Sequence, residues 1–218
     1  PLEANTVAQN KFCAYNIFEE DIKKFIEPLS ENISESIGSM GDDTPLAILS
    51  RFDRKFYDFF KQQFAQVTNP PIDSLRENSV MSLYKYLGSE DNLLNTAPTR
   101  NSAIRISTPI LSLKEINDLR SFNSWFPHQE IDCMYKIDSN LDTKLKIIKK
   151  SCEKSILNGN KIIFLTDQHL KAGHTPIPMA IIISVVHHYL IEKKLRSRVS
   201  LIAVVGDVVE DHHFATLI

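Results

Sequence analysis

Imidazole and carboxylate side chains gather in two short stretches of the C-terminal half of this sequence. The stretches 167–176 and 206–213 contain Asp167, His169, His174, Asp207, Glu210, Asp211, His212 and His213. Such nitrogen and oxygen ligands bind zinc or non-haem iron in other proteins. No pair here has the spacing that places two ligands on one face of a helix, and adjacent histidines point in different directions. We therefore expect no metal site and interpret these side chains as helix caps and partners of buried donors.

Two further groups have an ordinary structural interpretation. His187 and His188 lie in the middle of an apolar segment that predicts a helix, where core or interface histidines are the favoured interpretation. Asp42 and Asp43 precede a Thr-Pro pair, which fits a helix start as easily as a functional acid pair.

The sequence also lacks the motifs of several enzyme classes. It has no Gly-rich phosphate loop, no nucleophile elbow and no Cys-x-x-Cys pair, and it contains only 6 glycines. The cysteines match no metal spacing and favour a reduced compartment: Cys13, Cys133 and Cys152. We expect no catalytic and no cofactor-binding residue in this segment.

Composition indicates a globular chain with neither nucleic acid nor a membrane as a partner. The 218 residues are 43% hydrophobic, and 25 basic side chains nearly balance 27 acidic ones. The longest apolar stretch, residues 177–186, is far shorter than the roughly 20 residues of a membrane helix, so we expect a soluble, unexported protein. The chain begins at Pro1 and stops inside an apolar segment at Ile218, which we interpret as a fragment of a longer chain.

The N-terminal half predicts three helices. Asn16 and Glu19 have capping-box spacing and open the first, which reaches about Pro28. Asp53 caps the second, whose apolar face is most simply explained by core packing and comprises Phe56, Phe59, Phe60, Phe64 and Val67. Two prolines, Pro70 and Pro71, stop that helix and leave a rigid loop. Ser74 and Glu77 cap the third helix, which runs through Leu87 to Gly88.

The C-terminal half predicts alternating helices and strands. A first strand contains Ile104 and Ile106, and a helix begins at Ser112. Then follow a strand at 131–137, a helix at 141–159, a strand at 162–165, a helix at 178–194 and a strand at 199–205. Apolar strands in this alternation indicate a parallel α/β sheet, whose carboxyl-end loops face the usual ligand crevice. Those loops are the two stretches described first.

Three blocks of sequence resemble the central domain of the glutamate synthase large subunit. The first pairs GSMGDDTPLAILS (38–50) with FFKQQFAQVTNPPID (59–73). The second covers 82–88 and 92–94, and the third comprises 176–178, 187–188, 195–201 and 210–215. The resemblance implies one central domain over 1–218, divided into a lead-in at 1–35, a mainly helical part at 36–120 and an α/β part at 121–218 that forms an incomplete (β/α)8 barrel.

The family implies a function for this segment. An amidotransferase domain of the same chain releases ammonia from glutamine, and an FMN-binding synthase domain with an iron-sulfur cluster uses it to make glutamate from 2-oxoglutarate. The central domain would serve as a scaffold between them, with Met40, Thr68 and Asn69 lining the intramolecular ammonia tunnel. An electron-donor protein or small subunit and a cytoplasmic or plastid location are also implied.

The chain departs from the family at Val204 and Val209, where acidic and basic residues are usual, and at Gln168, where arginine is usual. The alternative is a free-standing, non-catalytic interaction domain related to that family, with those valines as marks of relaxed function.

Overall fold

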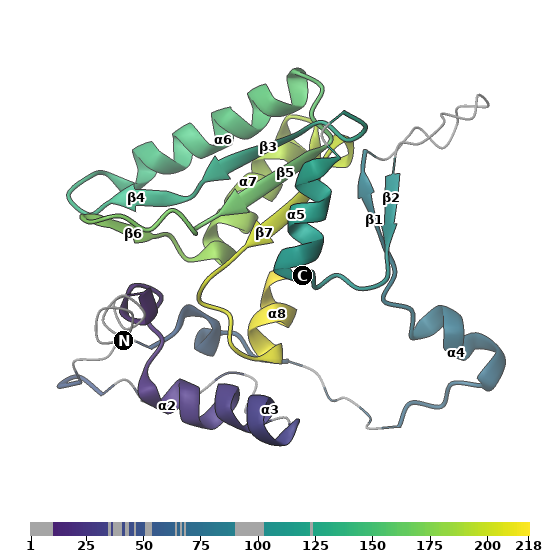
Figure 1. Ribbon diagram of the computed structural model, residues 1–218, viewed down its shortest axis with the longest axis vertical. Helices are drawn as coiled ribbons and strands as arrows, with labels where there is room; N and C mark the ends of the chain where they lie inside the picture. Colours follow the sequence, from purple (N-terminus) through teal and green to yellow (C-terminus); the bar gives the residue numbers. More distant parts are fainter. Residues whose placement is uncertain are drawn as a thin grey trace.

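A three-stranded parallel sheet lies at the centre of the molecule (Figure 1). The computed structural model describes residues 11–34, 36, 41, 44, 45, 47–50, 54–63, 65, 67, 69–89, 103–122 and 124–218. Strand β5 (Ile162–Thr166) pairs with β3 (His128–Asp132) on one side and β7 (Ser200–Val204) on the other. All five residues of β5 are buried, and the first four are apolar, because a strand covered on both faces does not alternate apolar with polar side chains.

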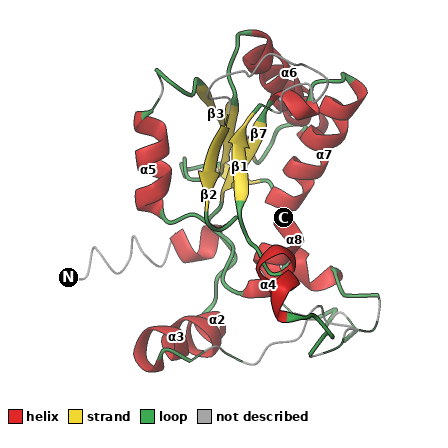
Figure 2. Cartoon of the chain, turned by 90° about the vertical axis from the view of Figure 1, so that its right-hand side faces the viewer, coloured by secondary structure: helices red, strands yellow, loops and turns green. Residues whose placement is uncertain are grey.

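Two long helices cover one face of this sheet (Figure 2). Helix α6 (Leu141–Leu157) connects β3 to β5, and helix α7 (Met179–Glu192) connects β5 to β7. Their apolar sides meet the sheet in one core with fully buried members on each element, including Ile148, Cys152, Ile163, Leu165, Ile182, Val186 and Leu190. Both crossover helices thus lie on the same face.

A shorter helix covers the opposite face (Figure 2), and a β-hairpin contributes side chains to the same core. Helix α5 (Leu113–Ser121) begins with the capping box that Ser112 forms with Glu115. Strands β1 (Lys85–Gly88) and β2 (Ala103–Ile106) pair antiparallel. The second core contains Leu87, Ile116, Leu119, Ile162, Phe164, Ile202 and Val204. Ser200 fixes the hairpin to the sheet, since its hydroxyl accepts from Gly88 N at 2.9 Å and donates to Gly88 O at 3.0 Å.

The predicted strand at 131–137 is interrupted. Strand β4 (Met134–Lys136) leaves the main sheet after Cys133 and pairs antiparallel with β6 (His174–Pro176), a strand that we did not predict. The 3₁₀ turn η3 (Arg196–Arg198) precedes the last strand, β7. Helix α8 (Asp211–Leu217), which we did not predict either, follows that strand. The α/β class with parallel strands is confirmed by the central sheet.

The first helix begins later than predicted. It comprises α2 (Glu19–Asp21), the π-helical turn η1 (Ile22–Ile26) and α3 (Glu27–Asn32). Asn16 is not its cap, because its φ of 55° places it in a left-handed turn. Phe18 takes the N-cap position, where its backbone N–H donates to Asp21 Oδ2 at 2.9 Å.

The second predicted helix is wrong. Among the described residues of this stretch, the helical structure is limited to a 3₁₀ turn, η2 (Phe56–Phe59), and Phe60 after it is extended. Phe59, Phe60 and Val67 are 60%, 42% and 67% exposed, so they form no buried helical face. Asp53 and Phe64 lie outside the described residues.

The third predicted helix is too long. Helix α4 (Ser74–Val80) is capped by Asp73, whose carboxylate accepts from Leu75 N and Arg76 N, rather than by Ser74. The chain beyond it forms β1, because pairing with β2 and the bonds to Ser200 satisfy its backbone. Among the described residues, no helix combines the length and apolar character required to cross a bilayer.

Candidate functional site at the carboxyl edge of the sheet

The carboxyl ends of β5 and β7 bring two aspartates together. Thr166 and Val204 are paired in register, and the Asp167 backbone N–H donates to Val204 O at 3.2 Å. The chain then turns at Gly206, whose N–H donates to Asp167 Oδ2 at 3.2 Å, immediately before Asp207. The two loops predicted to face the crevice therefore meet, as parallel pairing requires.

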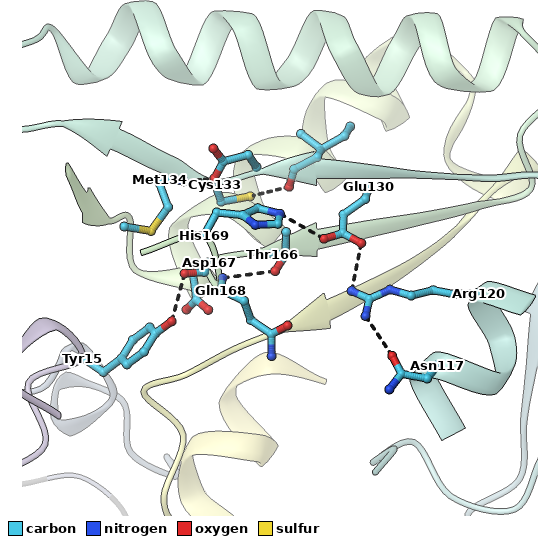
Figure 3. Close-up of polar contacts among 12 residues, drawn as sticks. Tyr15, Asn117, Arg120, Glu130, Cys133, Met134, Thr166, Asp167, Gln168 and His169 are labelled. Carbon is cyan, nitrogen blue, oxygen red and sulfur yellow. Dashed lines mark hydrogen bonds and ion pairs between the residues drawn. The ribbon is translucent and has the colours of Figure 1, made fainter. Parts of the chain in front are cut away.

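Asp167 is the more buried of the two aspartates and is only 2% exposed. Its Oδ1 has no hydrogen-bond partner among the described groups. Its backbone carbonyl accepts from the Tyr15 hydroxyl at 3.0 Å (Figure 3). Burial, reinforced by the charge of Asp207, raises the pKa of the Asp167 carboxyl to about 7. Asp167 is thus a carboxyl group that is readily protonated near neutral pH.

Asp207 accepts a hydrogen bond from a buried tyrosine. The Tyr57 hydroxyl donates to Asp207 Oδ1 at 3.0 Å, and its ring stacks on that of His213 with 4.4 Å between centroids. Burial raises the pKa of Asp207, although the Tyr57 bond opposes the rise. Burial and the same carboxylate raise the pKa of Tyr57. The phenol therefore stays protonated and acts as a donor.

His212 and His213 are both engaged in hydrogen bonds. His213 Nδ1 accepts from Val209 N at 3.2 Å, so its Nε2, 3.2 Å from Glu210 Oε1, carries the proton in the neutral ring. Burial lowers the pKa of His213 to about 4. His212 Nε2 lies 2.9 Å from the Tyr57 carbonyl, which can only accept. This pattern matches the structural interpretation of the two histidines.

The other histidines of the predicted rim lie apart from this cluster. His169 pairs with Glu130 at 3.1 Å, and Glu130 also binds Arg120 of α5 at 2.8 Å (Figure 3). His174 lies in β6, and its Nδ1 is 3.2 Å from the Ala172 carbonyl. Within the described ranges, no three His, Cys, Asp or Glu residues are grouped so that they could hold a metal ion.

We expect zinc to have little effect on this chain. Added zinc should leave the melting temperature of the chain nearly unchanged in differential scanning fluorimetry, because ligands stabilise a native state only through preformed sites. Substituting His174 or His212 with alanine should not alter that result. Micromolar zinc affinity that either substitution abolishes would contradict the expectation.

Two tyrosines from the N-terminal part of the chain complete the site. Tyr15 is half-buried against Gly206, where a Cβ would lie 2.3 Å from the Tyr15 ring. Burial raises the pKa of Tyr15 to about 12, with Asp167 and Asp207 contributing. Lys55 holds this segment together, because its Nζ donates to Asn16 O at 2.8 Å and lies 3.3 Å from Asp21 Oδ2. Sequence reasoning missed both tyrosines.

The three residues predicted to line a tunnel are only partly visible. Met40 and Thr68 lie outside the described residues, and Asn69 occupies an exposed bend before Pro70. Gly41, which follows Met40, is buried at φ 80°, and a Cβ there would lie 2.5 Å from the Phe60 carbonyl and 2.8 Å from Lys61 Cβ. Gly41 therefore packs directly on the backbone at Phe60 and Lys61.

The structure places the three residues at which the sequence was expected to depart from the resembled family. Val204 is 3% exposed in the second core, where it packs with Ile202 and Phe164. Val209 contributes its backbone N–H to His213, which does not depend on its side chain. Gln168 is exposed, and its N–H donates to Thr166 Oγ1.

The fold and this edge define an α/β domain with a parallel sheet. The chain belongs to the glutamate synthase central domain family, whose model matches residues 10–218. It is 38% identical over 206 residues to the glutamate synthase [NADPH] large chain of Bacillus subtilis, covering 94% of this chain and 13% of the relative.

Relatives with other electron donors in their names are equally similar. The ferredoxin-dependent glutamate synthase of Antithamnion sp. is 40% identical over 212 residues, which cover 94% of this chain and 14% of the relative. The glutamate synthase [NADH] of Schizosaccharomyces pombe is 36% identical over 211 residues, which cover 94% and 10%. The chain thus spans only a small part of the length of these relatives.

Proposed function

We propose that this chain is the central scaffold of a glutamate synthase and helps to form an ammonia tunnel from glutamine hydrolysis to glutamate synthesis from 2-oxoglutarate. The observation that carries the proposal is the contact of Gly41 with Phe60 and Lys61. It joins the two sequence blocks that contain the proposed tunnel residues. The described residues just before Pro70, namely 65, 67 and 69, are exposed, and two prolines follow them, as in a wall that faces another domain.

The cofactors of the parent enzyme belong elsewhere on this proposal. Iron-sulfur clusters are held by several cysteine thiolates that surround one site, whereas Cys13 is exposed and Cys133 and Cys152 are buried in the core. Burial raises the pKa of Cys133 and of Cys152 to about 12, so both are thiols packed among apolar side chains. The sequence offers no Gly-rich loop for the phosphate of FMN. The residues of this chain therefore fit neither an iron-sulfur cluster nor FMN.

The partners on this proposal are the amidotransferase and FMN-binding synthase domains of the same chain, together with an electron donor.

We also propose that the sheet is part of an incomplete (β/α)8 barrel. Consecutive strands are neighbours, and both crossover helices lie on one face, as they do around a barrel. The opposite face, which would line the barrel interior, is covered by α5, and β1 and β2 contribute side chains to the same core.

Filling the proposed constriction tests the tunnel. In the full-length enzyme, Thr68→Phe adds several heavy atoms to a loop that two prolines prevent from retreating easily. Glutamine hydrolysis should then exceed glutamate formation, while externally supplied ammonia still supports synthesis. The measurement is the ratio of glutamine consumed to glutamate formed, with Thr68→Ser as the matched control. Unchanged coupling with full activity in Thr68→Phe would remove the tunnel role of this loop.

A further inference from the structure

The carboxyl edge of the sheet is covered by a strap, defined here as residues 11–21 and 54–60. The two parts of the strap are joined through Lys55, which contacts Asn16 and Asp21. The strap reaches the sheet loops through two phenols, since Tyr15 donates to the Asp167 carbonyl and Tyr57 to Asp207. In α/β folds this edge normally binds ligands, so the strap occupies the place of a ligand.

Under the strap, Asp167 lacks the partners that a buried carboxylate requires. Gly206 N satisfies Oδ2, but Oδ1 has no partner among the described groups although the residue is 2% exposed. A buried charge with an unmatched oxygen is costly, whereas the neutral acid is much less so.

The groups that face Asp167 do not supply a matching cation. Asp207 and the Gly206 N–H face it from the loop after β7, Tyr15 and Tyr57 from the strap, and Cys133 from the end of β3. Lys55 of the strap is paired with Asp21, and its charge acts on Asp207. Asp207 carries a charge of the same sign, so ionising Asp167 would place two carboxylates in one dry site.

We propose that Asp167 is a proton-controlled latch, which holds the strap closed when its carboxyl is neutral and releases the strap when the carboxyl ionises. β5 cannot move to bring the charge into water, because it is hydrogen-bonded on both sides and buried on both faces. The strap is joined to the loops after β5 and β7 and to α8 by side-chain hydrogen bonds and one ring stack, so local opening there is a less costly route to solvent. This proposal about Asp167 does not rest on the proposed ammonia tunnel.

The sign of the pH effect follows from linkage. The Asp167 pKa is about 7 in the closed state and near the ordinary value of 3.8 once water reaches the group. Between these values the closed state holds a proton that the open state releases. The opening equilibrium therefore rises up to about tenfold per pH unit and levels off above about pH 7. His213, neutral down to about pH 4 when closed, contributes in the opposite direction below pH 6.5.

Hydrogen exchange resolved by peptide in the full-length protein tests the latch. Relative to Asp167→Asn, which retains the contribution of His213, the protection factors of residues 11–21 and 54–60, corrected for intrinsic exchange, should fall by up to about 50-fold from pH 5 to pH 7. Asp167→Asn keeps an oxygen for Gly206 N but cannot ionise, so its strap should show no such fall. Asp118→Asn, which changes an exposed aspartate of α5, should behave as the unmodified protein does.

Protection of residues 179–192, which form helix α7, reports whether Asp167→Asn disturbs the fold. If it does, a second variant keeps the test decisive. Asp207→Asn still accepts from Tyr57 but removes the charge that raises the Asp167 pKa. The protection of the strap should then level off at a lower pH. The same pH dependence of strap protection in the unmodified protein and in Asp167→Asn would overturn the proposal. So would a fall that only Asp207→Asn abolishes.

Discussion

Replacing Gly41 with valine should uncouple the two half-reactions of the full-length enzyme. The new Cβ would lie 2.5 Å from the Phe60 carbonyl, and φ at this position is 80°, which side-chain-bearing residues rarely adopt. Gly41 must then separate from the backbone at Phe60 and Lys61. On the proposed function, ammonia escapes through the gap, so glutamine hydrolysis should exceed glutamate formation several-fold.

A substitution at Gly159 distinguishes the effect of a steric clash from the effect of backbone strain. Gly159 has a similar φ of 89°, but a Cβ added there would have no atom within 4 Å. Gly159→Val should therefore lose about 1 kcal/mol of stability through strain alone and leave the coupling ratio unchanged. Equal ratios in the two variants would show that the contact of Gly41 does not seal a tunnel.

Replacing Phe164 with alanine should have the largest effect on stability. Phe164 is fully buried in the central strand, with the His128 ring 5.3 Å away and the Arg120 guanidinium 5.5 Å away. Truncating a buried phenylalanine costs about 3–5 kcal/mol. At about 2–4 °C per kcal/mol for a chain of this size, the melting temperature should fall by roughly 6–20 °C.

Thermal unfolding of the chain by circular dichroism measures this effect. Phe59→Ala provides the control, because Phe59 is 60% exposed and its removal creates no cavity. That variant should stay within about 1 kcal/mol of the unmodified chain. A fall as large in Phe59→Ala as in Phe164→Ala would contradict the placement of the core.

The C-terminal half could be predicted from sequence because its local signals agree with its tertiary environment. The Ser112 cap, the unbroken apolar run of β5 and the long apolar patterns of α6 and α7 each correspond to an observed element. In the N-terminal half these levels disagree. The aromatic spacing after Lys55 resembles a helix face. In the structure, however, Tyr57 is hydrogen-bonded to Asp207 and stacked on His213, and Phe59 is exposed to solvent.

Half of the candidate site was likewise predictable. Strand order alone places the residues after β5 and β7 at one edge, and it brought Asp167 and Asp207 together as expected. Tyr15 and Tyr57 reach the same edge from about 150 positions away in the chain. No local spacing encodes such a contact, and the sequence pattern therefore gave no signal for it.

Isotope competition tests the internal passage of ammonia most directly. The full-length enzyme is supplied with glutamine labelled with ¹⁵N at the amide, 2-oxoglutarate and excess unlabelled ammonium, and the ¹⁵N content of the newly formed α-amino group is measured. We predict near-complete retention of ¹⁵N in the unmodified enzyme and in Thr68→Ser, with strong dilution in Thr68→Phe. Equal retention in all three, with glutamine hydrolysis intact, would contradict a tunnel through this loop.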